Sequence, residues 1–229
     1  MNTVKYALYS CLITAFPSLA TEHTHQQFVE KAIAKFQATE RGNWTFAYHH
    51  SEVEEGEKTD VYAQYHPQKP RGKRWHLLKL NGTPPTPKQV AEFASSRENE
   101  GYRVPLSELI NPRSLSVESE TAHGITYTYP VQLADLGKDA IGKLTGSVTI
   151  NKVTASIEEI NIINTDKFSP VALANISHFK LNMRFQTLKN HVLPKSSYME
   201  MNGTFSFFID IEETSKTTFS DYQFLGTQK

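Results

Sequence analysis

Apolar residues recur at three- and four-residue spacing in the segment 24–41, with charged residues between them. They are Phe28, Val29, Ala32, Ile33 and Phe36. This spacing places them on one face of a helix, so the sequence predicts an amphipathic helix that ends near Gly42. A second, shorter helix is predicted over 88–98, because Thr86 can cap it and Pro87 fits its first position.

The period of the pattern changes to two in the rest of the chain. Apolar and polar residues alternate there, which is typical of strands that bury one face. The predicted strands are 44–49, 59–65, 74–80, 124–132, 142–151, 155–164, 178–187, 198–201, 204–213 and 216–224. The acidic run 52–57 is expected to be a solvated hairpin tip. Asn202-Gly203 is a hairpin signal between the two strands that flank it.

This order of elements predicts the fold class. Two helices in the first half of the chain cannot build a series of strand-helix-strand units, so a parallel sheet is excluded. We expect an α+β fold: one large, curved antiparallel sheet, an incomplete β-barrel, with the helices packed as a lid on its apolar concave face. No linker or internal repeat divides residues 21–229, so they are interpreted as a single domain.

The first twenty residues differ from the rest. Lys5 precedes an apolar stretch, and Ser18 and Ala20 put small residues at the positions that a signal peptidase requires. We therefore interpret residues 1–20 as a signal peptide cleaved after Ala20 and expect a periplasmic protein. A lipoprotein signal ending at Cys11 is the less favoured alternative, because few apolar residues precede that cysteine.

Charge and composition exclude some partners. The 229 residues carry 24 Lys and Arg against 24 Asp and Glu, so the formal net charge is zero. A nucleic-acid partner would require a clustered basic face, and none is expected. The cleaved chain contains no cysteine and no apolar run that could span a membrane. Its 38% hydrophobic residues are enough for a well-patterned core.

The sequence contains no recognisable catalytic or cofactor motif. Zinc, phosphate-loop, dinucleotide and nucleophile-elbow patterns are absent. His23, His25, His49 and His50 are candidates for a metal site, but adjacent residues of a strand point to opposite faces and no carboxylate pattern supports them. We therefore predict no enzyme activity, no metal and no cofactor.

Aromatic residues on the apolar side of the predicted strands are the candidate binding residues. The predicted lining of a hydrophobic groove consists of Trp44, Phe46, Tyr48, Trp75, Leu77, Tyr127 and Phe207. If the helices fill the concave face, these side chains form an ordinary core. If the face stays partly open, they form an apolar groove suited to acyl chains. The sequence leaves both possibilities open.

Three segments resemble a known family. They are Trp75-x-Leu77-x-x-x-Asn81-Gly82-x-x-Pro85-x-Pro87, the strand Gly146-x-Val148-x-Ile150-Asn151 with its partner 157–162, and the terminal Phe219-Ser220-Asp221-Tyr222. With the order of elements, they are similar to the LolA/LolB-like superfamily of periplasmic lipoprotein-sorting proteins. The resemblance implies an incomplete barrel whose hydrophobic cavity holds lipoprotein acyl chains in transit, without catalysis. Other members of that fold are envelope-stress sensors that bind a regulatory partner.

These observations predict a periplasmic, non-enzymatic carrier for a lipid, a lipoprotein acyl chain or another hydrophobic ligand. The alternative is an envelope sensor or interaction module of the same fold that binds another envelope protein and no small ligand.

Overall fold

The computed structural model describes residues 19–39, 41–97, 106–206 and 208–226. The helices are α1 (Leu19–Gln37), α2 (Pro87–Ser96) and the single turn α3 (Leu106–Leu109). Three short 3-10 turns are η1 (Arg41–Asn43), η2 (Ala134–Leu136) and η3 (Lys138–Ala140).

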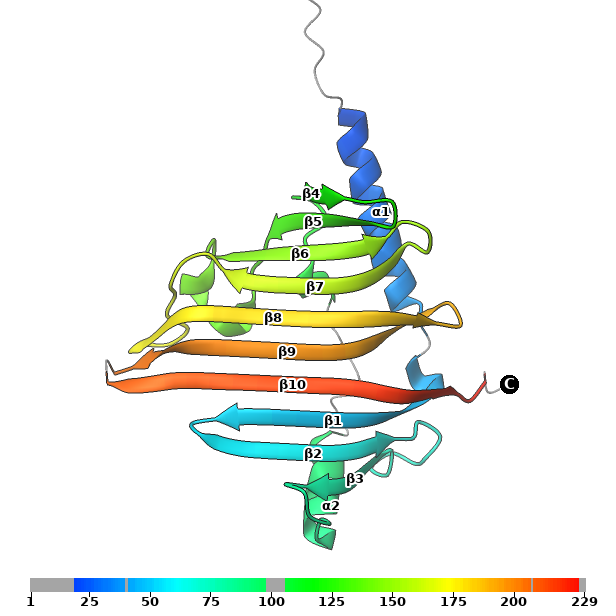
Figure 1. Cartoon of the computed structure of the whole chain (residues 1–229), viewed down its shortest axis with the longest axis vertical. Coiled ribbons are helices and arrows are strands. Elements are labelled where there is room, and N and C mark those ends of the chain that lie inside the picture. The colour runs from blue at the N-terminus through cyan, green and yellow to red at the C-terminus, as the bar shows by residue number, and fades with distance from the viewer. Residues whose placement is uncertain (1–18, 40, 98–105, 207, 227–229) are drawn as a thin grey trace, which may run out of the picture.

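The other elements are strands of one antiparallel sheet (Figure 1). They are β1 (Trp44–Glu54), β2 (Glu57–Tyr65), β3 (Trp75–Leu80), β4 (Ser116–Glu120), β5 (Gly124–Pro130), β6 (Leu144–Asn151), β7 (Ser156–Asn164), β8 (Ala174–Leu188), β9 (His191–Phe205) and β10 (Ile209–Phe224). The order across the sheet is β3-β2-β1-β10-β9-β8-β7-β6-β5-β4. The sheet is not closed, because β3 and β4 are its two free edges.

The helices lie on one face of the sheet, which we call the helix face. In Figure 1, α1 lies behind β4 to β7 and α2 behind the β3 edge. α1 contacts β7 and β9, and α2 contacts β3. The predicted antiparallel α+β fold with one large open sheet is therefore confirmed.

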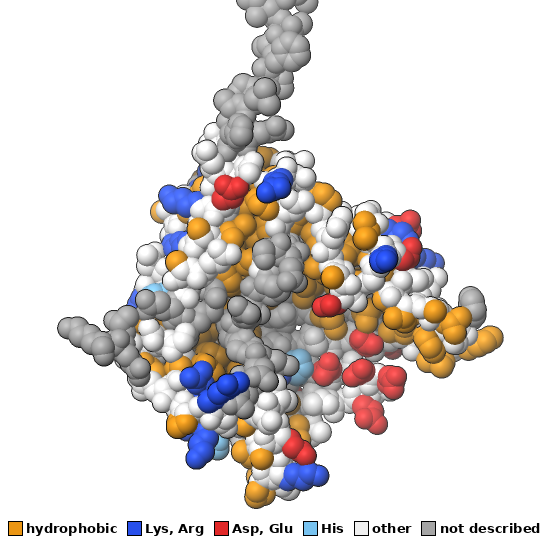
Figure 2. Space-filling model, turned by 180° about the vertical axis from the view of Figure 1, so that it is seen from behind, with side chains coloured by type: hydrophobic (Ala, Val, Ile, Leu, Met, Phe, Trp, Pro, Cys, Tyr) orange, Lys and Arg blue, Asp and Glu red, His pale blue; other side chains and the backbone are white. Residues whose placement is uncertain are grey.

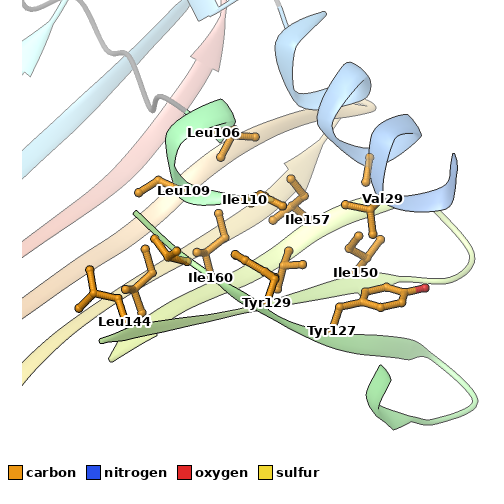
Figure 3. Packing of buried hydrophobic residues seen from close by; sticks show 14 of the residues in the cluster. Val29, Leu106, Leu109, Ile110, Tyr127, Tyr129, Leu144, Ile150, Ile157 and Ile160 are labelled. Carbon is orange, nitrogen blue, oxygen red and sulfur yellow. The ribbon is translucent and has the colours of Figure 1, made fainter. Parts of the chain in front are cut away.

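The apolar residues of the helix face gather into two separate cores. The α1 core joins α1 and α3 to β5, β6, β7 and β8, with Val29, Phe36, Tyr127, Ile150 and Ile160 among its fully buried members. Figure 3 shows Val29 of α1 and Ile110, just after α3, pointing at the side chains of these strands. The aromatic cluster joins β1, β2 and β3 to α2. Burial of alternate residues in β5 and β6 follows from the period of two.

Local signals explain where several elements begin and end. As predicted, Thr86 caps α2 and Pro87 stands at its first position. The cap is a capping box in which Gln89 is the partner of Thr86. The β1–β2 turn falls at Glu55-Gly56, where both residues have positive φ. This turn lies within the predicted acidic tip. α1 extends from Leu19 to Gln37, so it begins and ends earlier than the predicted 24–41.

The hairpin predicted at Asn202-Gly203 is wrong. Both residues lie inside β9, where Gly203 pairs with Ile176 on one side and Ile211 on the other. The strands predicted at 198–201 and 204–213 are parts of the long β9 and β10, and β4 was not predicted. A Cβ on Gly203 would lie 2.2 Å from the carbonyl oxygen of Asn175, so the glycine meets a need for space and not for a turn.

The predicted signal peptide lies outside the described residues, except for Leu19 and Ala20 in the first turn of α1. The described helices include none that is both long and apolar enough to span a membrane.

Candidate functional site

Four of the predicted groove residues lie together in the aromatic cluster. Phe46 and Tyr48 of β1 face Trp75 and Leu77 of β3, and all four are buried. The Phe46 ring stacks on Tyr65 at 5.0 Å, and Trp75 meets both Phe46 and Tyr48 edge-on. These side chains are enclosed by one another and by α2, so they form a packed core at this end of the sheet.

A cation lies on the same cluster. Arg97 follows α2, and its guanidinium carbon is 4.7 Å from the ring centre of Tyr48, 5.3 Å from that of Phe93 and 5.6 Å from that of Trp75. An arginine at this distance from several ring faces is held by cation–π attraction. It therefore fixes the end of α2 against β1 and β3.

Trp44 and Tyr127, two of the other three predicted groove residues, do not join this cluster. Trp44 packs on His191, Tyr222 and Phe224, and among the described residues its indole nitrogen has no hydrogen-bond partner. Tyr127 lies in the α1 core, fully buried, with its hydroxyl 2.8 Å from Nδ1 of His25. Burial raises the pKa of Tyr127 to about 12. Phe207 lies outside the described residues.

Partly exposed apolar side chains occur on the helix face between the two cores. We call them the methionine strip, which comprises Leu181, Met183, Met199, Met201 and Ile211. Leu181 pairs with Met199, so the strip crosses β8 and β9 in register. It includes three of the four methionines of the chain. Methionine side chains are flexible and polarisable, so they adapt to ligands of varied shape.

A polar seam borders the methionine strip on the side of the aromatic cluster. Met199 pairs with Ser215, and Ser197 pairs with Thr217, which itself pairs with His50. Nδ1 of His50 lies 2.9 Å from the Thr217 hydroxyl. Burial lowers the pKa of His50, so the imidazole is held toward its neutral form. The helix face therefore has an apolar side and a polar side in its middle.

Acidic side chains close one end of this seam. Glu213 of β10 lies near the acidic tip of the β1–β2 hairpin, which comprises Glu52, Glu54 and Glu55. Burial raises the pKa of Glu213, and the negative charges of the acidic tip raise it further. Figure 2 shows acidic side chains gathered on this part of the helix face.

The histidines considered as metal ligands are separated by the fold. His49 faces away from the helices, stacks on Tyr62 at 4.1 Å and binds Asp60, whereas His50 lies on the helix face. His25 pairs with Tyr127, and the His23 side chain lies outside what the structure describes. In the described part of the chain, no three His, Cys, Asp or Glu side chains come together as a metal site.

A hollow of about 560 Å³ lies over the central strands β8, β9 and β10. It opens where β9 and β10 diverge: their pairing ends at Ser196 and Thr218, although both strands continue. The Tyr222 hydroxyl donates to the carbonyl oxygen of Pro194 across the gap. Lys195 and Lys216 are among the residues that line this hollow, and none of the six predicted groove residues that the structure describes does.

The sequence indicates which residues lie on the helix face, but not which of them stay exposed. Alternation placed Leu181 and Met183 on the same face as Phe179 and Phe185, and it could have flagged Met199 and Met201 in the same way. Their partial exposure had no signal in the sequence, because it depends on where α1 and α2 stop covering the sheet.

The sequence matches no protein-family model and no curated protein. Among solved structures, the crystal structure of a DUF1329 family protein from Desulfovibrio piger is similar, with a TM-score of 0.35 and 8% sequence identity. That alignment covers 89% of this chain and 95% of the other. A likeness at this TM-score does not establish the fold family, so the LolA/LolB-like resemblance stays a prediction from the sequence.

Proposed function

We propose that this protein is a non-enzymatic carrier in the periplasm that binds the apolar chain of a lipid, a lipoprotein or a similar amphiphile on the methionine strip. The observation that carries the proposal is the partial exposure of the strip on a face whose two ends are closed by buried cores. An acyl chain that covers the strip gains about 0.8 kcal/mol for each CH₂ group removed from water.

The surroundings of the methionine strip suit an amphiphile. Its apolar side continues into the α1 core, and its other side meets the hydroxyls of Ser215 and Thr217. A chain lying on the strip therefore has a polar border for its head group. In this proposal α1, which contacts β7 and β9, forms the wall of the site on the side of the α1 core.

The choice of residue for a mutational test depends on how buried its side chain is. Tyr127 is fully buried, so a charge placed there would destabilise the fold before it reported on a ligand. Met199 is the better probe, because it is partly exposed in the centre of the strip. Met199→Glu places a carboxylate where the chain would lie. Ser196→Glu, on the opposite face of the same strand, is the matched control.

The experiment combines native mass spectrometry of protein purified from periplasm with uptake of a fluorescent fatty acid and a fluorescent phospholipid. We expect a stoichiometric amphiphile on the wild type and on Ser196→Glu, and at least tenfold weaker uptake by Met199→Glu. Circular dichroism and thermal unfolding verify that both variants fold. Equal uptake by folded Met199→Glu would refute the site. Wild-type protein that carries no amphiphile in native mass spectrometry and takes up neither fluorescent lipid would refute the carrier function and favour the interaction module.

A further inference from the structure

Five large apolar side chains are exposed together at one end of the sheet. Val171 is 62% exposed, Leu173 60%, Phe205 38%, Phe208 90% and Ile209 58%. We call these five residues the apolar tip. Figure 2 shows a hydrophobic patch projecting at the right, beyond the acidic side chains, at the β9–β10 end of the sheet. Monomeric proteins rarely expose apolar patches of more than a few hundred Å², and such patches mark sites of interaction.

The backbone holds the two halves of the apolar tip side by side. Val171 and Leu173 lie between β7 and β8, and the other three residues lie at the β9–β10 connection. The amide of Ser206 donates to the carbonyl oxygen of Leu173 at 2.9 Å, and that of Phe208 donates to the carbonyl oxygen of Phe205 at 3.3 Å. The tip is therefore a built feature of the fold, held together by these two backbone hydrogen bonds.

Leu173 has an unusual backbone conformation. Its φ is +70°, in the left-handed region that a bulky residue rarely adopts. Such strain persists only where the surrounding structure enforces it, and here the bond from Ser206 fixes the Leu173 carbonyl. The bond holds the Leu173 backbone beside the β9–β10 connection, where its side chain is exposed.

The apolar tip carries no charge in either of its two sequence segments. Residues 168–177 and 204–209 include no Asp, Glu, Lys, Arg or His. The nearest ionisable residues along the chain are Lys167, His178 and Asp210. A charged side chain is costly inside a bilayer, whereas a protein interface tolerates charges at its rim. A projecting, uncharged group of aromatic and aliphatic side chains is therefore suited to enter a bilayer.

We propose that the apolar tip inserts into the surface of a zwitterionic lipid bilayer. Interfacial segments bury their apolar side chains about 5–10 Å deep, which is within reach of side chains that project from the end of a hairpin. The neighbouring acidic tip and Glu213 oppose attraction to anionic lipids, so binding comes from the apolar side chains. This inference is independent of the carrier function, because the methionine strip contributes nothing to it.

Vesicle binding of the purified full-length mature protein tests the proposal. The variant is Phe208→Asp, and the matched control is Val153→Asp, which changes an 84% exposed side chain in the β6–β7 turn at the opposite end of the sheet. In co-sedimentation with phosphatidylcholine vesicles, we expect Phe208→Asp to lower the bound fraction at least fivefold and Val153→Asp to leave it unchanged. Replacing a third of the lipid by phosphatidylglycerol is expected to give no increase.

A second measurement reports on insertion itself. A tryptophan in Phe208→Trp is expected to be quenched by phosphatidylcholine with brominated acyl chains, whereas one in Val153→Trp is not. Equal vesicle binding by Phe208→Asp and the wild type, or no quenching of Phe208→Trp, would overturn the proposal. Light scattering gives a third result: a wild-type dimer that Phe208→Asp converts to a monomer would assign the apolar tip to a second copy of the chain and would also overturn it.

Discussion

Replacing Gly203 by alanine tests the register of the central strands directly. The added Cβ would lie 2.2 Å from the carbonyl oxygen of Asn175 and 2.9 Å from Cα of Ile176. Ordinary contact begins at 3.4 Å, and both obstacles are backbone atoms that cannot rotate away. The variant folds only if β8 and β9 move apart, which strains the hydrogen bonds between them.

The expected cost follows from two opposing effects. Overpacking of this kind costs about 1–3 kcal/mol. Removing the extra flexibility of glycine in the unfolded chain returns about 0.5–1 kcal/mol. We therefore expect Gly203→Ala to lower the free energy of unfolding by about 1–2 kcal/mol, which corresponds to a fall in Tm of roughly 2–8 °C for a chain of this size. Urea unfolding followed by circular dichroism measures it.

Two further variants make the test specific. A Cβ added at Gly42 would have no other atom within 4 Å, so Gly42→Ala is expected to change the free energy of unfolding by less than about 0.5 kcal/mol. Gly203→Asn distinguishes the observed strand position of residue 203 from the hairpin turn that the sequence predicted. Asparagine is tolerated at positive φ in a turn, but in the strand it is bulkier than alanine. If Gly203→Asn is as stable as the wild type, the register of β8, β9 and β10 is wrong.

Three other predictions concern the α1 core and the surroundings of the acidic tip. Phe36→Ala, which removes an edge-to-face contact of α1 with the sheet, is expected to cost about 3–5 kcal/mol in urea unfolding, and a cost below about 1 kcal/mol would contradict the packing of α1. Tyr127→Phe should cost about 1 kcal/mol at pH 7 through the lost bond to His25. The pKa of Tyr127 is raised in the folded state, so its hydroxyl loses the proton at lower pH in the unfolded state, and the stability of the wild type falls above about pH 10. Thermal unfolding should show a smaller loss of stability at alkaline pH in Tyr127→Phe. Glu213→Gln should stabilise the protein by a few tenths of a kcal/mol near pH 7, because the raised pKa of Glu213 means that its ionised form is unfavourable in the folded state. The gain should vanish near pH 4, where Glu213 is protonated in the wild type. A stabilisation that persists at pH 4 would exclude this cause.

Whether a feature could be predicted from the sequence depends on whether the residues that determine it are neighbours in the chain. The capping box of α2 and the turn at Glu55-Gly56 depend on neighbouring residues, and both were predictable. Asn202-Gly203 carries the same kind of local signal, yet it lies in a strand. There the space available beside Gly203 is set by Asn175 of β8, which is distant in the sequence, and this tertiary requirement overrides the turn preference.

The candidate site shows the same limit. Alternation identified Tyr48, Trp75 and Tyr127 as residues of the apolar face, and the structure places all three on buried core positions of that face. Which apolar residues stay accessible was not predictable, because alternation gives the face of a side chain and not what covers it. Met199 and Met201 pack against the edge of the α1 core and are not enclosed by it, so they remain partly exposed.

The sequence by itself determined the type of protein: an antiparallel sheet with few helices, one apolar and one polar face, and no catalytic motif. These properties follow from periodicity and composition, which are local or summed over the chain. Tertiary structure alone decided the division of the apolar face into two cores, the accessible methionine strip between them and the apolar tip formed by two connections. Each of these depends on contacts between residues far apart in the sequence, and such contacts exist only after the ten strands have paired.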